Sequence, residues 1–192
     1  MRWKVRSWMA DVLRTHPDVV HLAAKQRAKF EGWFKFELAA RMARAGVDEV
    51  RIEPGGVVPH ARHDLSFLWE GERYFVELKT VNTNWRIKGL ENRPRPVTKN
   101  FNALTKDLHK LAPYGSRGLM AFVIFPVPPG DARWQSYVAN ACAKVRFSFS
   151  AEDDCETLIF ETPSSEKYGL VTCVLSVSSD PPRGSKPFID PS

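Results

Sequence analysis

The order of the expected elements predicts an α/β protein with a mixed central β-sheet flanked by helices. Three observations carry this prediction. The first 45 residues show helical spacing, apolar residues alternate on both sides of a turn at Glu70-Gly71, and a continuous apolar run occupies 118–127. An uninterrupted apolar strand is typical of a central position in a sheet that is buried on both faces.

The N-terminal quarter is predicted to be helical. Apolar residues recur at helical spacing over 3–14, and Pro17 interrupts this helix. A second helix is expected from Asp18, a capping residue, to about Ala45, where a glycine follows. A strand at 47–53 comes next and ends at a Pro-Gly-Gly sequence.

The remainder of the chain alternates strands and helices. Strands are expected at 64–69 and 73–80, around the turn. Residues 81–99 are polar and lack periodicity, which predicts a loop. Helices at 100–112 and 131–144 flank the apolar strand. Further strands are expected at 145–150, 156–161 and 170–178.

The 192 residues are enough for one domain with a substantial core. We assign residues 1–179 to a single domain, of which 1–27 form a helical extension. Residues 180–192 contain four prolines and are expected to form a flexible tail. No apolar run approaches the ~20 residues of a membrane-spanning helix, and the first residues lack the apolar segment of a secretory signal. We therefore expect no association with a membrane.

The cysteines bear on location. Cys142, Cys155 and Cys173 are an odd number without CxxC spacing. This argues against a disulfide framework and against a structural zinc, and it favours a reducing, cytoplasmic environment. The three side chains are expected to be buried small apolar groups.

The net charge of +6 is distributed unevenly. Segment 46–78 has seven acidic and three basic residues, whereas 1–45 has four and ten, and 79–110 has two and eight. A basic surface attracts polyanions, and an acidic pocket within it suits a metal-dependent phosphodiesterase. A solvated face with no partner is the alternative.

The turn fixes the register of the central hairpin. With Glu70-Gly71 as the turn, Trp69 pairs with Glu72, so Asp64 lies opposite Glu77. Apolar side chains then share one face of the hairpin, and polar side chains share the other.

The polar face of the hairpin has the residue types that metal-dependent chemistry requires. Asp64, Ser66, Glu77 and Lys79 lie on it. Opposed carboxylates repel each other, and a divalent cation between them would remove the repulsion. The Lys79 ammonium could hold a phosphate or orient an attacking water. A solvent-exposed polar face without a ligand is the alternative. His63 would point to the opposite side and is expected to be structural.

These residues resemble a known signature. His63-Asp64 followed by Glu77-Leu78-Lys79 is similar to the PD-(D/E)XK motif of the restriction-endonuclease-like nuclease superfamily. His63 stands at the variable first position of that motif. The family's next helix and buried strand correspond to 100–111 and 118–127, so the resemblance covers about residues 28–128.

The family also has a helix before the hairpin that often carries a further metal-binding glutamate. The sequence Gly-Trp-Phe-Lys-Phe-Glu-Leu at 32–38 resembles that helix and makes Glu37 the match. Glu31 is the competitor, six residues earlier and on a different face of the helix.

The resemblance implies a restriction-endonuclease-like core and a metal-dependent nuclease that hydrolyses phosphodiester bonds, with DNA favoured over RNA. Asp64, Glu77 and the Leu78 backbone carbonyl would bind Mg²⁺ or Mn²⁺, and Glu37 would contribute directly or through water. Lys79 would position the nucleophilic water and stabilise charge at the phosphorus. Symmetric cutting of both strands would call for a homodimer.

The segment after the hairpin is basic and could track a nucleic-acid backbone beside the site, with Trp85 approaching bases. A solvated loop is the alternative. Its basic residues are Arg86, Lys88, Arg93, Arg95 and Lys99.

Two other functions compete with the nuclease. One is a catalytically silent nucleic-acid-binding or regulatory protein on the same fold. The other is an interaction protein whose acidic residues are only surface groups.

Overall fold

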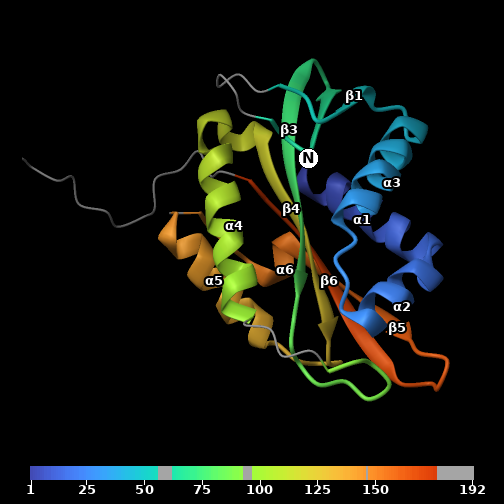
Figure 1. Cartoon of the computed structure of the whole chain (residues 1–192). Helices are drawn as coiled ribbons and strands as arrows, with labels where there is room; N and C mark the ends of the chain where they lie inside the picture. The colour runs from blue at the N-terminus through green and yellow to red at the C-terminus, as the bar shows by residue number, and fades with distance from the viewer. Residues whose placement is uncertain (56–61, 93–96, 146, 177–192) are drawn as a thin grey trace, which may run out of the picture.

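A six-stranded mixed β-sheet runs through the middle of the molecule (Figure 1). The computed structural model describes residues 1–55, 62–92, 97–145 and 147–176, so the expected tail at 180–192 lies outside it. The strands are arranged in the order β1-β2-β3-β4-β6-β5. Their bounds are β1 (Asp48–Ile52), β2 (Leu65–Trp69), β3 (Glu72–Asn82), β4 (Gly118–Val127), β5 (Cys155–Glu161) and β6 (Lys167–Ser176).

Helices cover both faces of the sheet (Figure 1). The helices of the first face are α1 (Arg2–Thr15), α2 (Pro17–Gln26) and α3 (Glu31–Arg44). The main helices of the second face are α4 (Val97–Leu111) and α5 (Arg133–Lys144). A 3₁₀ helix, η1 (Ala112–Arg117), leads into β4, and a short helix, α6 (Ala151–Asp154), leads into β5.

One parallel strand pair sets the topology. β3 and β4 are parallel, and the other strand pairs are antiparallel. Parallel neighbours need a crossover connection, which α4 provides. β4 is buried along its whole length, as its continuous apolar sequence predicts. The predicted mixed α/β class is therefore confirmed.

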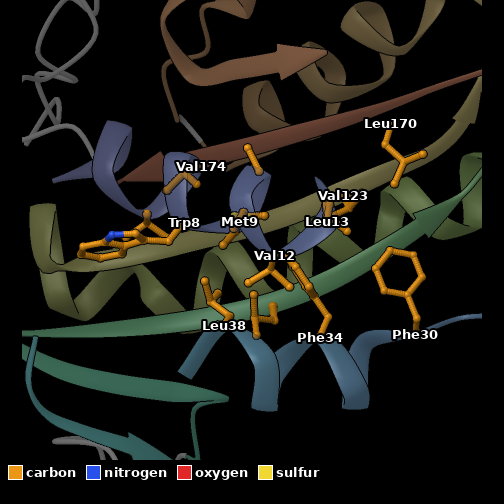
Figure 2. Packing of buried hydrophobic residues seen from close by; sticks show 14 of the residues in the cluster. Trp8, Met9, Val12, Leu13, Phe30, Phe34, Leu38, Val123, Leu170 and Val174 are labelled. Carbon is orange, nitrogen blue, oxygen red and sulfur yellow. The ribbon is translucent and has the colours of Figure 1, made fainter. Parts of the chain in front are cut away.

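Two apolar clusters hold the layers together. In the first, side chains of α1 and α3, such as Met9, Leu13 and Phe34, pack against β4 and β6 (Figure 2). In the second, Leu104 and Leu108 of α4 pack with α5 against the other face of the sheet. Six residues of α1 are buried in the first cluster, so this helix is part of the core.

The predicted hairpin is confirmed in register. Trp69 pairs with Glu72, and the last pair of the β2–β3 ladder is Leu65 with Val76. Asp64, expected opposite Glu77, lies just before β2 and outside the ladder, and its carboxylate accepts a hydrogen bond from the Leu78 N–H. Most other predicted elements agree with the structure to within a few residues, including β1, β4, β5, β6, α1 and α5.

Three expectations about the elements are wrong. The helix expected from Asp18 to Ala45 is broken, because Arg27 adopts a left-handed conformation with φ 53° and its N–H closes the end of α2. The expected loop at 81–99 is shorter, since β3 extends to Asn82 and α4 begins at Val97. Among the described residues at 145–150 there is no strand.

The expectation against a disulfide is also wrong. Cys155 and Cys173 lie directly opposite each other on β5 and β6 and are joined by a disulfide. Cys142 is the free, buried cysteine. Counting cysteines could not reveal that two of them face each other across neighbouring strands. In the described residues, no helix is both long and apolar enough to cross a membrane.

Candidate functional site

The candidate site lies where β2 separates from β3. The ladder between these strands ends at Leu65 and Val76, but β3 continues to Asn82. Beyond that point, no strand among the described residues pairs with one edge of β3, while β4 occupies the other edge. Backbone N–H groups at this open edge must find other partners.

Two carboxylates bind the N–H groups at the open edge. The Leu78 N–H donates to Asp64 Oδ2 over 2.8 Å, and the Thr80 N–H donates to Glu31 Oε2 over 2.9 Å. Leu78 and Thr80 lie two residues apart, so their backbone groups point to the same edge of the strand. Asp64 comes from the segment that enters β2, and Glu31 is the first residue of α3. Side chains from two elements thus meet on either side of Lys79.

Lys79 extends toward α4, where its ammonium is paired with Asp107. Burial alone would lower the pKa of Lys79. The hydrogen bond to Asp107 and the negative charges of Asp107, Glu31 and Asp64 outweigh burial, so the pKa of Lys79 is raised above its usual value. Lys79 is therefore a protonated cation at neutral pH, and it donates hydrogen bonds rather than accepting a proton.

Glu77 is nearly buried and tightly held. Its Oε1 lies 2.6 Å from His63 Nδ1 and 2.6 Å from Lys110 Nζ. His63 is fully buried, and its Nε2 lies 2.8 Å from Tyr114 Oη. His63 therefore turns toward Glu77, so the expectation that it points away is wrong. Both of these contacts use Oε1 of Glu77.

A second lysine reaches Asp64. Lys35 Nζ of α3 lies 3.6 Å from Asp64 Oδ1 and 2.6 Å from Glu53 Oε1. The hydrogen bond to Glu53 is the main cause of a raised pKa of Lys35, and the negative charge of Asp64 adds to it. Lys35 thus partly neutralises Asp64.

Glu37 does not join this group. Its carboxylate lies 3.4 Å from His16 Nε2, at the junction of α1 and α2. Glu31 reaches β3 instead, because six residues along a helix turn a side chain to a different face. The structure thus places the competitor, rather than the residue matched by the motif, beside Lys79.

The basic residues predicted to contact nucleic acid after β3 have different environments. Arg86 and Lys99 are exposed, and Lys88 Nζ forms an ion pair with Glu166 over 2.5 Å. Arg93 and Arg95 lie outside the described residues. Trp85 is buried, with the Arg133 guanidinium 4.6 Å from its ring centroid, so the expectation that Trp85 approaches bases is wrong.

A buried arginine anchors this segment. Arg27 donates to the backbone carbonyls of Thr83, Trp85 and Glu91, over 2.7–3.1 Å. In return, Asn82 Nδ2 donates to the Arg27 carbonyl over 2.6 Å. The turn between α2 and α3 is thereby bonded to the end of β3, which helps fix Glu31 against that strand.

The oxygen atoms at the candidate site are only partly suited to bind a cation such as Mg²⁺. Asp64, Glu31 and Glu77 supply carboxylate oxygens, and the Leu78 carbonyl shares the open edge with its own N–H. Mg²⁺ often takes one or two carboxylates and fills its other positions with water. Within the described ranges, no group of three or more His, Cys, Asp or Glu side chains is arranged to hold a metal ion. The residues therefore fit a two-carboxylate site completed by water rather than a ready cage.

Several members of this group were not predicted from the sequence. Asp107 and Lys110, three residues apart on α4, contact Lys79 and Glu77 respectively. Their spacing puts them on one face of the helix, but no local pattern shows which strand residues they meet. Comparisons with family models, with curated proteins and with solved structures return no match.

Proposed function

We propose that this chain is a metal-dependent nuclease with a restriction-endonuclease-like core, and that DNA is its preferred substrate over RNA. One observation supports this most strongly. Asp64 and Glu31, from different elements, bind the backbone N–H groups on both sides of Lys79. Carboxylates and a lysine meeting at one strand are the groups that cation-assisted phosphodiester hydrolysis needs.

Each residue has a role in this proposal. Asp64, Glu77 and the Leu78 carbonyl would hold Mg²⁺ or Mn²⁺, and Glu31 would contribute through a bound water; the cation would supply Lewis-acid activation of the phosphodiester and a more acidic bound water. Glu31 takes the place in this set that the motif gave to Glu37, because Glu31 is the residue beside β3.

Lys79 acts as a hydrogen-bond donor in the proposed reaction. Its raised pKa keeps it protonated, so it would orient the attacking water or bind a non-bridging phosphate oxygen. Asp107 fixes the direction of the ammonium, and His63 and Lys110 fix Glu77. Cutting both strands of a duplex symmetrically would require two copies of the chain.

A cleavage assay tests the proposal. Plasmid and single-stranded DNA would be incubated with the purified protein in Mg²⁺, Mn²⁺ or EDTA, together with Lys79→Ala, Glu77→Gln and the exposed control Lys167→Ala. We expect metal-dependent cleavage by the wild type and the control, and a loss of at least a hundredfold in both site variants. Cleavage that persists in Lys79→Ala and Glu77→Gln would refute the assignment of the site.

A matched pair of variants on α3 tests the metal ligands. Glu31→Gln keeps an acceptor for the Thr80 N–H but removes the charge, whereas Glu37→Gln changes the contact with His16. Mg²⁺ at about 100 times its Kd would stabilise the wild type by about 2.7 kcal/mol, which is about 5–10 °C in Tm. We expect Glu31→Gln to lose most of this shift and Glu37→Gln to keep it. The reverse pattern would return the role to Glu37.

A catalytically silent nucleic-acid-binding protein is the second candidate. The observation that favours it is the engagement of Glu77 by both His63 and Lys110, which occupies one oxygen of an expected metal ligand. Salt-sensitive DNA binding with no cleavage in any metal would support this second candidate over the nuclease.

A further inference from the structure

A groove runs between α4 and α5, on the face of the sheet toward which Lys79 points. A hollow of about 250 Å³ is lined by Thr98, Phe101 and Asn102 of α4 and by Tyr137, Asn140 and Lys144 of α5. A second hollow of about 250 Å³ is lined by α5 residues alone; it shares Tyr137 and Asn140 with the first and extends to Arg133. The two hollows together follow α5 from its first residue to its last.

The walls of the groove offer hydrogen-bond donors. Asn102 Oδ1 accepts a hydrogen bond from Lys144 Nζ over 2.9 Å, which leaves the Asn102 amide N–H groups for another partner. Asn140 presents a second exposed amide. Phe101 and Tyr137, stacked with their ring centroids 5.1 Å apart, form an apolar floor.

The charge of the two helices favours an anion. Lys99, Lys106, Lys110, Arg133 and Lys144 are their basic residues, and Asp107 is their one acidic residue. Asp107 is paired with Lys79, so its charge is already compensated. Asp131, just before α5, pairs with Arg133. Lys99 and Lys144 have no carboxylate partner among the described residues and remain available.

The groove and the candidate site share one helix, α4. This helix contacts β3 through Asp107 and Lys110 and lines the groove with Thr98 and Asn102. Arg133 and Lys144 lie about 16 Å apart along an axis that rises 1.5 Å per residue. That length corresponds to about five nucleotides of one B-form strand.

We propose that the groove between α4 and α5 binds the sugar-phosphate backbone of the nucleic-acid strand on which the candidate site acts. Lys144, which lines the groove, and Lys99, an exposed α4 residue that follows the lining residue Thr98, contact phosphates. The amides of Asn102 and Asn140 donate to phosphate or sugar oxygens. The assignment of this strand as the substrate rests on the proposed nuclease function.

Binding measurements test the groove independently of catalysis. Fluorescence anisotropy with a labelled 30-nucleotide DNA strand, its duplex and the matching RNA would be measured in EDTA at several salt concentrations. The double variant Lys99→Ala/Lys144→Ala removes one charge from the groove and one from the exposed surface of α4 next to it. Arg44→Ala/Lys167→Ala removes two exposed charges elsewhere and serves as the matched control.

We expect Lys99 and Lys144 each to contribute about 0.7–0.9 to the slope of log K against log salt. At 0.1 M salt that slope corresponds to about fivefold to eightfold in affinity for each contact, or about 25-fold to 60-fold for the double variant. The control should change little, and unchanged Tm values would show that both variants fold. The three probes identify which nucleic acid the groove prefers.

The outcomes separate the two proposals. If the wild type cuts DNA and the groove variant binds as the control does, the groove proposal fails and the nuclease stands. If binding depends on the groove lysines but no substrate is cut in any metal, the groove stands and the nuclease fails. If the wild type binds none of the three probes in EDTA, the groove proposal fails, and the nuclease fails as well if no substrate is cut in any metal.

Discussion

Replacement of the buried Arg27 should strongly destabilise the protein. In Arg27→Met, the carbonyls of Thr83, Trp85 and Glu91 lose a charged donor at 2.7–3.1 Å. A buried acceptor without a partner costs about 1–3 kcal/mol. Since the three losses share one side chain and are not additive, we expect a total of about 3–5 kcal/mol. Arginine and methionine are equally unfavourable at the left-handed φ of this position, so the backbone contribution cancels.

Thermal and urea unfolding would measure this cost. For a chain of this size, about 3–5 kcal/mol corresponds to a decrease in Tm of about 6–20 °C. Arg86→Met is the matched control, because Arg86 is exposed on the segment that Arg27 anchors, and it should change the free energy of unfolding by less than about 0.5 kcal/mol. A loss below about 1 kcal/mol in Arg27→Met would show that water or a rearranged loop satisfies the three carbonyls, and it would refute the anchoring role.

Three further predictions concern charge, thiols and packing. The pKa of Lys79 is raised in the folded protein, so its ion pair should contribute fully to stability below about pH 10.4. This contribution should be lost only as pH rises through the higher folded pKa. The Tm difference between wild type and Lys79→Met should therefore stay constant from pH 7 to 9 and shrink above that window. Burial raises the pKa of Cys142 to about 12, so a thiol reagent at pH 8 should label no cysteine in the folded protein. It should label one cysteine after denaturation and three after denaturation with reduction. Two fast-reacting thiols before reduction would contradict the Cys155–Cys173 disulfide. A Cβ at Gly118 would lie 2.7 Å from the Leu111 carbonyl oxygen, so Gly118→Ala should lower the free energy of unfolding by about 1–3 kcal/mol. A Cβ at Gly32 on α3 would meet nothing within 4 Å, so Gly32→Ala should leave stability unchanged or raise it by up to about 1 kcal/mol. Equal unfolding midpoints for the two variants would refute this contrast.

The hairpin and the central strand could be predicted because their signals are local. The alternation around Glu70-Gly71 fixes which residues face each other, and the unbroken apolar run of β4 marks a strand buried on both sides. Neither feature depends on distant parts of the chain. The predicted register is therefore reproduced from Trp69–Glu72 to Leu65–Val76, where the ladder ends before the expected Asp64–Glu77 pair.

The break between α2 and α3 could not be predicted in the same way. Arg27 ends α2, but the carbonyls that hold its side chain lie 56–64 residues further along the chain. Local spacing continues across the break, so the sequence pattern favours one long helix. Tertiary hydrogen bonds decide the outcome.

The candidate site was predicted only in part, because some of its residues are placed by the hairpin and others by the packing of helices. Asp64, Glu77 and Lys79 follow from the hairpin alone, and in the structure Asp64 binds the N–H of Leu78, the residue between Glu77 and Lys79. The choice between Glu31 and Glu37 depends on the rotation of α3 about its own axis relative to β3. The spacing of apolar residues in α3 does not determine this rotation. The contacts of His63, Asp107 and Lys110 required the packed structure.

The paired contacts of α4 with β3 also constrain how this sequence can change. Lys79 and Glu77 have opposite charges, and α4 presents Asp107 and Lys110 to them in the complementary order. A single replacement at any of the four positions removes a partner from a partly buried charge. Substitutions at these positions should therefore arise together in diverging descendants of this protein, as compensated pairs rather than one at a time.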